Sequence, residues 1–436
     1  MTLPLLRWSQ LSLEERRTAL RRPAQSNADE LQRRVRAIID DVRARGDDAL
    51  YDYARRFDGA ALDELEVQPR EYDNAQRALN DVQVAALQRA IDNVRTFHEA
   101  QIAPTLRLET SPGVVCERHF RPIDAVGLYV PAGVAPLPSA AIMTAVPASI
   151  AGCPTRILCT PPRKDGTADP AVLVAAKLCD VNRVFKVGGA QAIAAMAYAT
   201  QSVPKVDKIF GPGSSWVTAA KLLCANDPDG AALDLPAGPS EVLVIADDSA
   251  RPEFIAADLL AQAEHSNDAQ VVFVTTSEGL AQAVAEEIEQ QMRRLGREDT
   301  LRASIDHSRI FIVDTIEQAF EVSNAYAPEH LIVQVTEARR WLEHVRNAGS
   351  VFLGYWTPET MGDYCSGTNH VLPTYGFARA YSGLSLADFM KRITVQELTP
   401  AGLQDLGPTA ISIAALEGLD AHANAVQVRL AHLARG

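Results

Sequence analysis

Short apolar runs alternate with stretches of helical period through most of the chain. Between residues 125 and 246, runs such as RVFKVGG, VDKIF and EVLVIA alternate with patterns such as AQAIAAMAYA, in which apolar residues recur at helical spacing. The alternation repeats in QVVFVTT, SRIFIVD, HLIVQV and SVFLG, with helices expected over residues 281–295, 317–325 and 337–347. This order is typical of parallel βα units, so we predict an α/β fold with two mostly parallel sheets.

Both ends of the chain lack this alternation. Residues 27–101 carry apolar positions at helical spacing and open with a capping-box pattern, in which Glu30 follows Asn27 by three residues. No strand is expected beyond Leu384, and the tail is predicted to be helical with a break at Gly418. Because such a tail is too short to hold a core alone, it must pack on something else.

A run of 31 uncharged residues, 125–155, has the length of a membrane span. Five prolines and several glycines interrupt it, which favours a strand, a loop, a helix and a second strand of a buried layer. The apolar stretch at the N-terminus is cut by Arg7 and is too short for a signal peptide. Six cysteines without paired spacing or a CxxC motif indicate a reduced, cytoplasmic compartment.

Composition narrows the class of partner. The 436 residues suit two or three domains, and a hydrophobic content of 47% is enough for sizeable cores. The formal net charge of -13 argues against a nucleic acid or an anionic membrane as partner. The same charge is compatible with a cationic substrate.

Two polar pairs stand at the ends of predicted elements. Glu329 and His330 lie where a helix ends before Pro328 and a strand begins, so both side chains can reach one cleft, although a solvated turn gives the same pattern. Gln262 and His265 are three residues apart on a predicted helix and share one face. Both can touch one ion, and a hydrated helix end is the ordinary alternative.

Two further pairs lie nearer the C-terminus, and each alone is a weak signal. Asp363 and His370 occur in the glycine-rich loop GDYCSGTNHVLP, and Glu417 and His422 flank the break in the tail. If Asp420 caps the last helix, His422 lies in the first turn of that helix. The positive end of the helix dipole there favours the neutral imidazole that a metal requires.

The sequence contains no complete fingerprint for a dinucleotide. GPGSSW, which begins at Gly211, lacks the third glycine and the spaced acidic partner. KVGGAQ follows a strand and opens a helix, so its free amides can face a phosphate or another polar ligand. An ordinary tight βα turn explains the same pattern.

One long stretch carries a family resemblance. Residues 234–265, DLPAGPSEVLVIADDSARPEFIAADLLAQAEH, match the signature of the histidinol dehydrogenase family, including its AGPSE core and its closing QAEH. The chain resembles that family, zinc enzymes that complete histidine biosynthesis, over nearly its whole length. Further matching motifs are VGGAQAIAA, KIFGPG, YAPEHL, AGSVFLG, GDYCSGTNHVLPT, TVQEL and AHANAV.

The resemblance implies a metal site and a substrate site. One zinc per subunit is held by the residues that match Gln262, His265, Asp363 and His422, and His422 comes from the partner subunit of a domain-swapped homodimer. An oxygen and nitrogen shell without thiolate suits an ion with exchangeable positions. The residues expected to contact L-histidinol are Ser240, His330, His370 and Glu417, together with the four metal ligands.

The family reaction oxidises L-histidinol to L-histidine in two steps, each of which passes a hydride to NAD, with L-histidinaldehyde kept on the enzyme. Removal of a hydride from an alcohol requires a base for the hydroxyl proton, and His330 titrates in the right range. Oxidation of the aldehyde requires a water that adds to the carbonyl, and Glu329 can activate it. We therefore assign both residues catalytic roles, with the zinc positioning the substrate.

The resemblance also locates the cofactor. Family members contact NAD through positions that match Tyr129 and Gln191, within an incomplete Rossmann-like domain. Ser214 stands where the family usually has asparagine, and Ala132 stands where it usually has a second glycine. Both departures lie near the expected cofactor cleft. Since serine still offers one hydrogen bond, we expect weaker contact with NAD and not its loss.

We expect an N-terminal arm, two α/β domains and a C-terminal arm. Three alternatives remain open: a related dehydrogenase for another alcohol, a zinc hydrolase in which Glu329 activates water, and a metal that only joins the subunits. The expected parts are the arm 1–25, a first domain of 26–128 and 242–384 with the metal and catalytic residues, a second Rossmann-like domain 129–241 on the NAD side, and a helical dimerisation arm 385–436.

Overall fold

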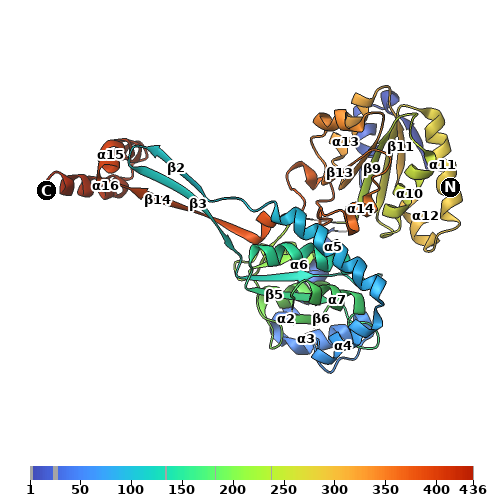
Figure 1. The fold of residues 1–436 in the computed structure, drawn as a ribbon, viewed down its shortest axis with the longest axis horizontal. Helices are drawn as coiled ribbons and strands as arrows, with labels where there is room; N and C mark the ends of the chain where they lie inside the picture. Colours follow the sequence, from blue (N-terminus) through green and yellow to red (C-terminus); the bar gives the residue numbers. More distant parts are fainter. Residues whose placement is uncertain (1–2, 23–27, 133–134, 182, 237, 436) are drawn as a thin grey trace. The chain divides into compact units, whose positions relative to one another are not determined.

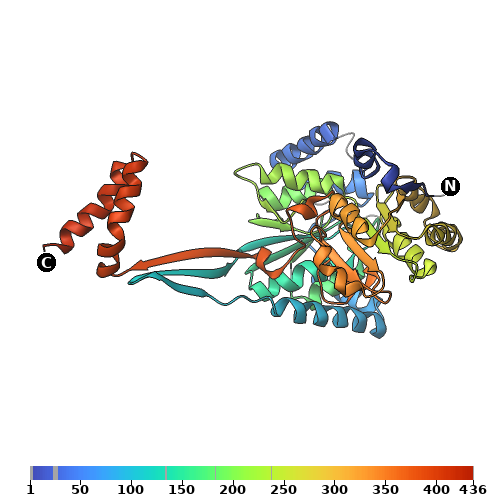
Figure 2. The same ribbon diagram turned by 90° about the horizontal axis from the view of Figure 1, so that it is seen from above.

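The chain forms two compact units in the computed structural model, which describes residues 3–22, 28–132, 135–181, 183–236 and 238–435 (Figure 1). The large unit consists of residues 1–100 and 123–389, and the small unit consists of residues 101–122 and 390–436. The large unit contains two parallel sheets with helices packed around each of them (Figure 2).

The first sheet has six parallel strands in the order β1-β11-β10-β9-β12-β13. Along β9, Val242 and Val244 join a core with α10, α11 and α12, whereas Leu243 and Ile245 join a core with α13. Both faces are therefore covered, as uncharged strands require. The bounds are β1 Leu5–Arg7, β9 Glu241–Ala246, β10 Gln270–Thr275, β11 Arg309–Ile312, β12 His330–Gln334, β13 Ser350–Leu353, α1 Leu13–Ala19, α10 Pro252–Ala263, α11 Glu278–Met292, α12 Glu298–Asp306, α13 Ile316–Tyr326 and α14 Glu359–Tyr364.

The second sheet has five parallel strands in the order β6-β5-β4-β7-β8. The uncharged stretch 125–155 forms β4, a loop, α6 and the start of β5, which confirms its predicted division. No helix of the described residues has the length and apolarity needed to cross a membrane. The bounds are β4 Ala125–Tyr129, β5 Thr155–Thr160, β6 Arg183–Lys186, β7 Lys208–Phe210, β8 Ala232–Leu233, α6 Pro138–Ala151, α7 Pro170–Leu178, α8 Gly189–Tyr198 and α9 Ser215–Ala225.

The N-terminal helices pack on the second sheet, which differs from the predicted domain of residues 26–128 and 242–384. Val35, Ile39 and Leu50 share one core with Phe185 of β6 and Met196 of α8. An amphipathic pattern shows that a helix has a face to bury and does not show which sheet it covers. The predicted start of this region at Asn27 lies outside the described residues. The bounds are α2 Ala28–Arg45, α3 Asp47–Tyr53, η3 Ala54–Asp58, α4 Pro69–Ala78 and α5 Asp81–Glu99.

The small unit is an antiparallel sheet, ordered β14-β3-β2, followed by two helices. The absence of strands beyond Leu384 was therefore a wrong prediction, because β14 begins at Met390. The break at Gly418 is confirmed: its φ of +69° separates α15 from α16. The bounds are β2 Leu106–Ser111, β3 Val114–Pro122, β14 Met390–Leu398, α15 Pro400–Leu416 and α16 Asp420–Leu433. The helix predicted over 337–347 is a 3-10 helix, η4 Ala338–His344, in the large unit.

Candidate active site

Glu329 and His330 lie at the amino end of β12, an interior strand of the six-stranded sheet between β9 and β13. Helix α13 ends at Tyr326, and Ala327 then adopts a left-handed conformation with a φ of +55° before Pro328. This turn directs the chain into β12, whose first residue is His330. Both side chains are buried, with exposed fractions of 6% for Glu329 and 3% for His330. The pair is therefore not part of a solvated turn.

The neighbouring strand β9 holds both members of the pair through its first residue, Glu241. The backbone N–H of Glu241 donates to Glu329 Oε2 at 2.8 Å, and the Glu241 carbonyl lies 3.2 Å from His330 Nδ1. His330 Nδ1 and Glu329 Oε2 are 3.6 Å apart. On the other side of the ring, His330 Nε2 lies 3.2 Å from Asp363 Oδ1. The imidazole thus has two carboxylates as neighbours.

Burial and charge move the pKa values of this pair. Burial raises the pKa of Glu329 to about 8, against the opposing effect of the His330 charge. Burial lowers the pKa of His330, but the charges of Glu329 and Asp363 outweigh it and raise the value to about 10. A buried acid with a raised pKa beside an imidazole is an arrangement that proton-transfer sites use.

Glu359 belongs to this cluster and was missed in the sequence. It is the first residue of α14, is 1% exposed, and burial raises its pKa well above the ordinary value. With the Gln262 amide oriented so that its nitrogen faces an acceptor, Gln262 donates to the two Glu359 oxygens at 3.0 and 3.2 Å. In sequence, Glu359 resembles an exposed acid in the first turn of a helix, and no local signal marks it as buried.

The predicted metal ligands are divided between the two units. In the large unit, α10 ends at Ala263, so Gln262 is helical and His265 lies beyond the helix, not on its face as predicted. His265 Nδ1 lies 3.1 Å from the Ala261 carbonyl. A positive charge on His265 contributes to the lowered pKa of Asp363. Among the described residues, no group of three or more histidine, cysteine, aspartate or glutamate side chains is assembled closely enough to hold a metal.

The predicted substrate residues are divided in the same way. In the large unit, Ser240 immediately precedes β9, and His370 Nδ1 lies 2.8 Å from the Asp363 carbonyl. In the small unit, Glu417 is the C-cap of α15 and His422 lies in the first turn of α16. The predicted cap of α16 was wrong, because Leu419 is the N-cap and Asp420 is the first helical residue.

The predicted cofactor residues gather at the carboxyl ends of the five-stranded sheet. Tyr129 ends β4, and its hydroxyl accepts a hydrogen bond of 2.9 Å from the N–H of Gly189, the first residue of α8. Gln191 is buried in the first turn of α8, and Ser214 is the N-cap of α9. Strands β4 and β7 are neighbours, while their connections lead to opposite edges of the sheet. Such a switch point leaves a crevice at the carboxyl ends, where ligands bind in α/β sheets.

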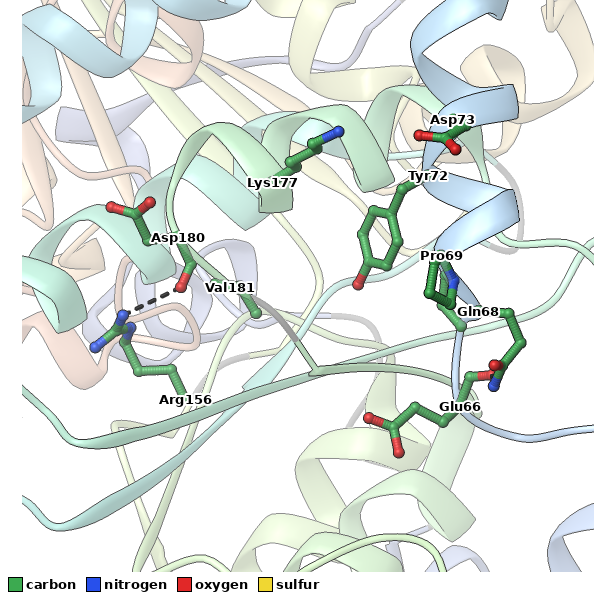
Figure 3. A pocket seen from close by; sticks show the side chains of 10 residues that line it. Glu66, Gln68, Pro69, Tyr72, Asp73, Arg156, Lys177, Asp180 and Val181 are labelled. Atoms are coloured by element: carbon green, nitrogen blue, oxygen red, sulfur yellow. Dashed lines mark hydrogen bonds between the residues drawn. The ribbon is translucent and has the colours of Figure 1, made fainter.

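A cavity of about 760 Å³ lies elsewhere in the large unit (Figure 3). It is lined at one side by Tyr72 and Pro69 and at the other by Arg156 and Asp180, where Arg156 donates to the Asp180 carbonyl at 3.1 Å. None of the predicted site residues lines it. The chemistry of the buried acids and histidines therefore belongs to the amino end of β12 and not to this cavity.

Comparison with known proteins identifies the family. A model of the histidinol dehydrogenase family matches residues 20–430. This chain belongs to the histidinol dehydrogenase family. Histidinol dehydrogenase from Xanthomonas campestris pv. campestris is 55% identical over 98% of both chains, and the enzyme from Photobacterium profundum is 51% identical over 98% of this chain and 95% of its own.

A solved structure agrees with this assignment. Histidinol dehydrogenase from Elizabethkingia anophelis aligns with a TM-score of 0.94 and 43% identity, covering 99% of this chain and 98% of that one. The family resemblance noted in the sequence is thereby confirmed, as is the α/β fold with mostly parallel sheets. The chain is an oxidoreductase, which removes the hydrolase alternative.

Proposed function

We propose that this histidinol dehydrogenase family member oxidises L-histidinol to L-histidine, through bound L-histidinaldehyde, as the last step of histidine biosynthesis. The observation that carries the proposal is the buried pair Glu329 and His330 at the amino end of β12. Oxidation of an alcohol to a carboxylate needs a proton acceptor for each step and one activated water, and this pair supplies both kinds of group.

His330 takes the proton from the substrate hydroxyl when its ring is neutral. The Glu329 and Asp363 charges raise the pKa of the free ring to about 10, and a positively charged substrate beside them opposes this effect. We assign the Nδ1 proton to the Glu241 carbonyl, 3.2 Å away, which fixes the ring and leaves Nε2 as the basic atom. The Gln262 amide nitrogen, 3.1 Å from Nδ1, then directs both of its protons to Glu359. Nε2 faces Asp363, one of the proposed metal ligands, so it points toward the metal and substrate side of the cluster. The role rests on this placement.

Glu329 prepares the water that adds to the aldehyde. Its Oε2 accepts the Glu241 N–H, and we assign Oε1 to the water. Burial favours the neutral carboxyl, so a proton taken from the water is held more strongly here than on an exposed glutamate. Glu329 therefore acts in the second oxidation and His330 in both.

We propose that Gln262, His265 and Asp363 hold one zinc per subunit, with the partner subunit's His422 completing the set. The donors fit the ion chemically, since an amide oxygen, a carboxylate and imidazole nitrogens suit zinc in a catalytic site. Glu359 accepts from the Gln262 amide nitrogen, which leaves the amide oxygen free to coordinate. When bound, the metal supplies a positive charge that orients the substrate.

The cationic substrate fits the surroundings of the pair. Glu329, Glu359 and Asp363 lie around His330, and the His330 charge helps to keep the pKa of Asp363 low, so an ammonium or imidazolium group meets the Asp363 carboxylate and favours ionisation of the other two carboxyl groups. We assign further contacts with L-histidinol to Ser240, His370 and Glu417.

NAD is the proposed hydride acceptor, bound through Tyr129, Gln191 and Ser214 at the carboxyl ends of the Rossmann-like sheet. The N-termini of α8 and α9 open at this edge, and free amides at a helix N-terminus favour phosphate groups. Serine at position 214 supplies a single hydroxyl where the family usually has an amide, and Ala132 adds a methyl group near the same edge. We expect both differences to weaken NAD contact without abolishing it.

We also propose a homodimer that shares its active sites through the small unit, and a cytoplasmic location. Apolar side chains remain exposed over the described residues of the small unit, as an interface requires. All six cysteines are free, which suits a reducing compartment. The exposed residues include Leu106, Leu108, Ile393, Val395, Ile413, Leu416 and Val428.

The test is to follow NADH formation from L-histidinol and to count NADH for each L-histidine made. Two NADH per histidine and loss of activity after chelation are expected. A ratio of one contradicts the four-electron reaction, and full activity after chelation reduces the metal to a link between subunits. Faster turnover of an amino alcohol without imidazole favours a relative that acts on another alcohol.

A further inference from the structure

A buried ion pair lies directly behind the catalytic residues. Arg22, from the segment after α1, meets Glu241, the first residue of β9, with side-chain exposures of 8% and 3%. Arg22 donates through Nε to Oε1 and through Nη2 to Oε2, the latter at 2.8 Å. This two-pronged contact joins residues 219 positions apart in the chain.

Arg22 also holds the turn that precedes the catalytic pair. Its Nη2 donates to the carbonyl of Tyr326 at 2.8 Å and lies 3.4 Å from the carbonyl of Ala327. The guanidinium lies 4.0 Å from the centre of the Tyr326 ring. Ala327 has a φ of +55°, a conformation that L-residues other than glycine keep only when their surroundings enforce it. Arg22 thus contacts two successive carbonyls of this turn, and Arg379 donates to the preceding carbonyl, that of Ala325.

Glu241 connects the ion pair to three other points of the site. Its N–H donates to Glu329, and its carbonyl faces His330. Its carboxylate also accepts the N–H of Tyr375 at 2.8 Å, and Tyr375 has a φ of +55° like Ala327. The backbone of Glu241 thus holds both catalytic residues, while its carboxylate holds Arg22 and the turn at Tyr375.

We propose that Arg22 and Glu241 are positioning residues that fix Glu329 and His330 in their working geometry. The inference rests on the proposed histidinol oxidation. A buried ion pair adds little net stability compared with apolar side chains of the same size, so stability alone does not account for it. The ion pair instead fixes the positions of the catalytic groups, because small displacements of such a group lower the rate by large factors. It does so through its contacts with Tyr326, Ala327, Glu329 and His330.

Arg22→Lys and Arg22→Ala test the proposal. Lysine keeps the charge and loses the planar fork, so it cannot hold Glu241 and the Tyr326 carbonyl together. We expect kcat for L-histidinol to fall about 10²-fold, with KM for L-histidinol and for NAD within about threefold of the parent values. Added guanidinium ion is expected to increase kcat of Arg22→Ala about tenfold. It is expected to leave kcat of Arg22→Lys unchanged, because the lysine ammonium group occupies the site.

Arg16→Ala is the matched control. Arg16 lies in α1, the helix that precedes Arg22. It donates to the Trp8 carbonyl at 3.2 Å, and its guanidinium lies 4.9 Å from the centre of the Trp8 ring. We expect it to lower the melting temperature, leave kcat unchanged and show no response to guanidinium.

Two results overturn the proposal: parental kcat in folded Arg22→Lys, or a loss of kcat in Arg22→Ala that guanidinium does not restore. If Arg22→Ala does not fold, Arg22→Lys decides the matter. Failure of the proposed function is separate, since it appears as absence of NADH formation by the parent protein itself.

Discussion

The two parallel sheets of the large unit carry their proposed functional residues at opposite ends of their strands. We call these ends the carboxyl edge and the amino edge. In the five-stranded sheet, the predicted cofactor residues lie at the carboxyl ends of β4 and β7 and at the starts of the helices that follow. In the six-stranded sheet, Glu329, His330 and Glu241 lie at the amino ends of β12 and β9. The first arrangement follows the usual rule for α/β sheets, and the second does not.

The direction of the helices explains which charge each edge favours. In βα units the helices run against the strands, so helix N-termini gather at the carboxyl ends and helix C-termini at the amino ends. Helices α8 and α9 begin near Tyr129, where the positive end of each helix dipole favours phosphate groups. Helices α10 and α13 end near Gln262 and Glu329, where the negative end of each helix dipole favours cations. A metal and an ammonium group are the proposed occupants of that edge.

The largest expected effect comes from the amino edge. His330→Asn removes the proton acceptor, so kcat for L-histidinol and for L-histidinaldehyde is expected to fall about 10³-fold, while NAD affinity stays the same. Steady-state NADH formation and NAD titration by fluorescence measure the two quantities. If NAD affinity falls as much as kcat, the catalytic and cofactor functions are not separated between the two sheets.

Glu329→Gln separates the two residues of the pair. Aldehyde oxidation is expected to fall about 10²-fold, because it alone needs the activated water, and the alcohol step is expected to stay within about threefold. Single-turnover NADH formation from each substrate reports the two steps. Glu337→Gln, at an exposed acid, is the control. Equal losses in both steps refute this division of labour.

Asp258 lies midway along α10, between the two ends of the six-stranded sheet, and tests the effect of a buried carboxyl group on stability. Burial raises its pKa to about 7, and Gln334 donates to it at 2.7 Å. The unfolded chain releases this proton near pH 4, so the contribution to stability is complete below that pH and is lost as the pH rises to about 7. Asp258→Asn is therefore expected to increase the free energy of unfolding at pH 8 by about 2 kcal/mol, with a smaller gain at pH 5.

Urea unfolding at the two pH values measures this effect. The control is Asp247→Asn at the carboxyl end of β9, where hydrogen bonds from Ser249 and the Thr336 N–H outweigh burial and lower the pKa of the carboxyl. It is expected to bring no gain at pH 8. An equal gain in the free energy of unfolding at pH 8 in both variants would show that burial does not distinguish the two carboxyl groups.

The smallest expected effect comes from the carboxyl edge. Tyr129→Phe loses the hydrogen bond from the Gly189 N–H, worth about 1 kcal/mol, so KM for NAD is expected to rise about fivefold with kcat unchanged. Steady-state kinetics at varied NAD measures it. A fall in kcat without a change in KM assigns Tyr129 to the chemistry and not to cofactor binding.

Local pattern was sufficient for most of the large unit. The apolar runs of β9, β10 and β12 are long, uncharged and bounded by turn residues, so their strands were predictable. The turn at Pro328 likewise marked the boundary at which Glu329 and His330 lie. Strand β14 was missed because eight of its nine residues are exposed, and its sequence therefore lacks a buried apolar face.

Contacts between distant residues were beyond any local pattern. The role of Glu241 depends on Arg22, and the burial of Glu359 depends on Gln262; neither partner is near in sequence. The packing of the N-terminal helices was equally unpredictable from local pattern, since their apolar faces fit either sheet. The family resemblance supplied the zinc, NAD and dimer assignments, which still await the measurements described above.

The small unit has a consequence for protein synthesis. Strand β3 pairs with β14, and Met390 lies 268 positions after its partner Pro122. A ribosome needs on the order of tens of seconds to make the intervening chain. During that time the β2–β3 hairpin is exposed on the nascent polypeptide with one unpaired edge, which is a template for aggregation. Slower elongation or a premature stop codon between residues 354 and 390 should therefore increase dependence on chaperones, even though every strand of both parallel sheets has by then been synthesised.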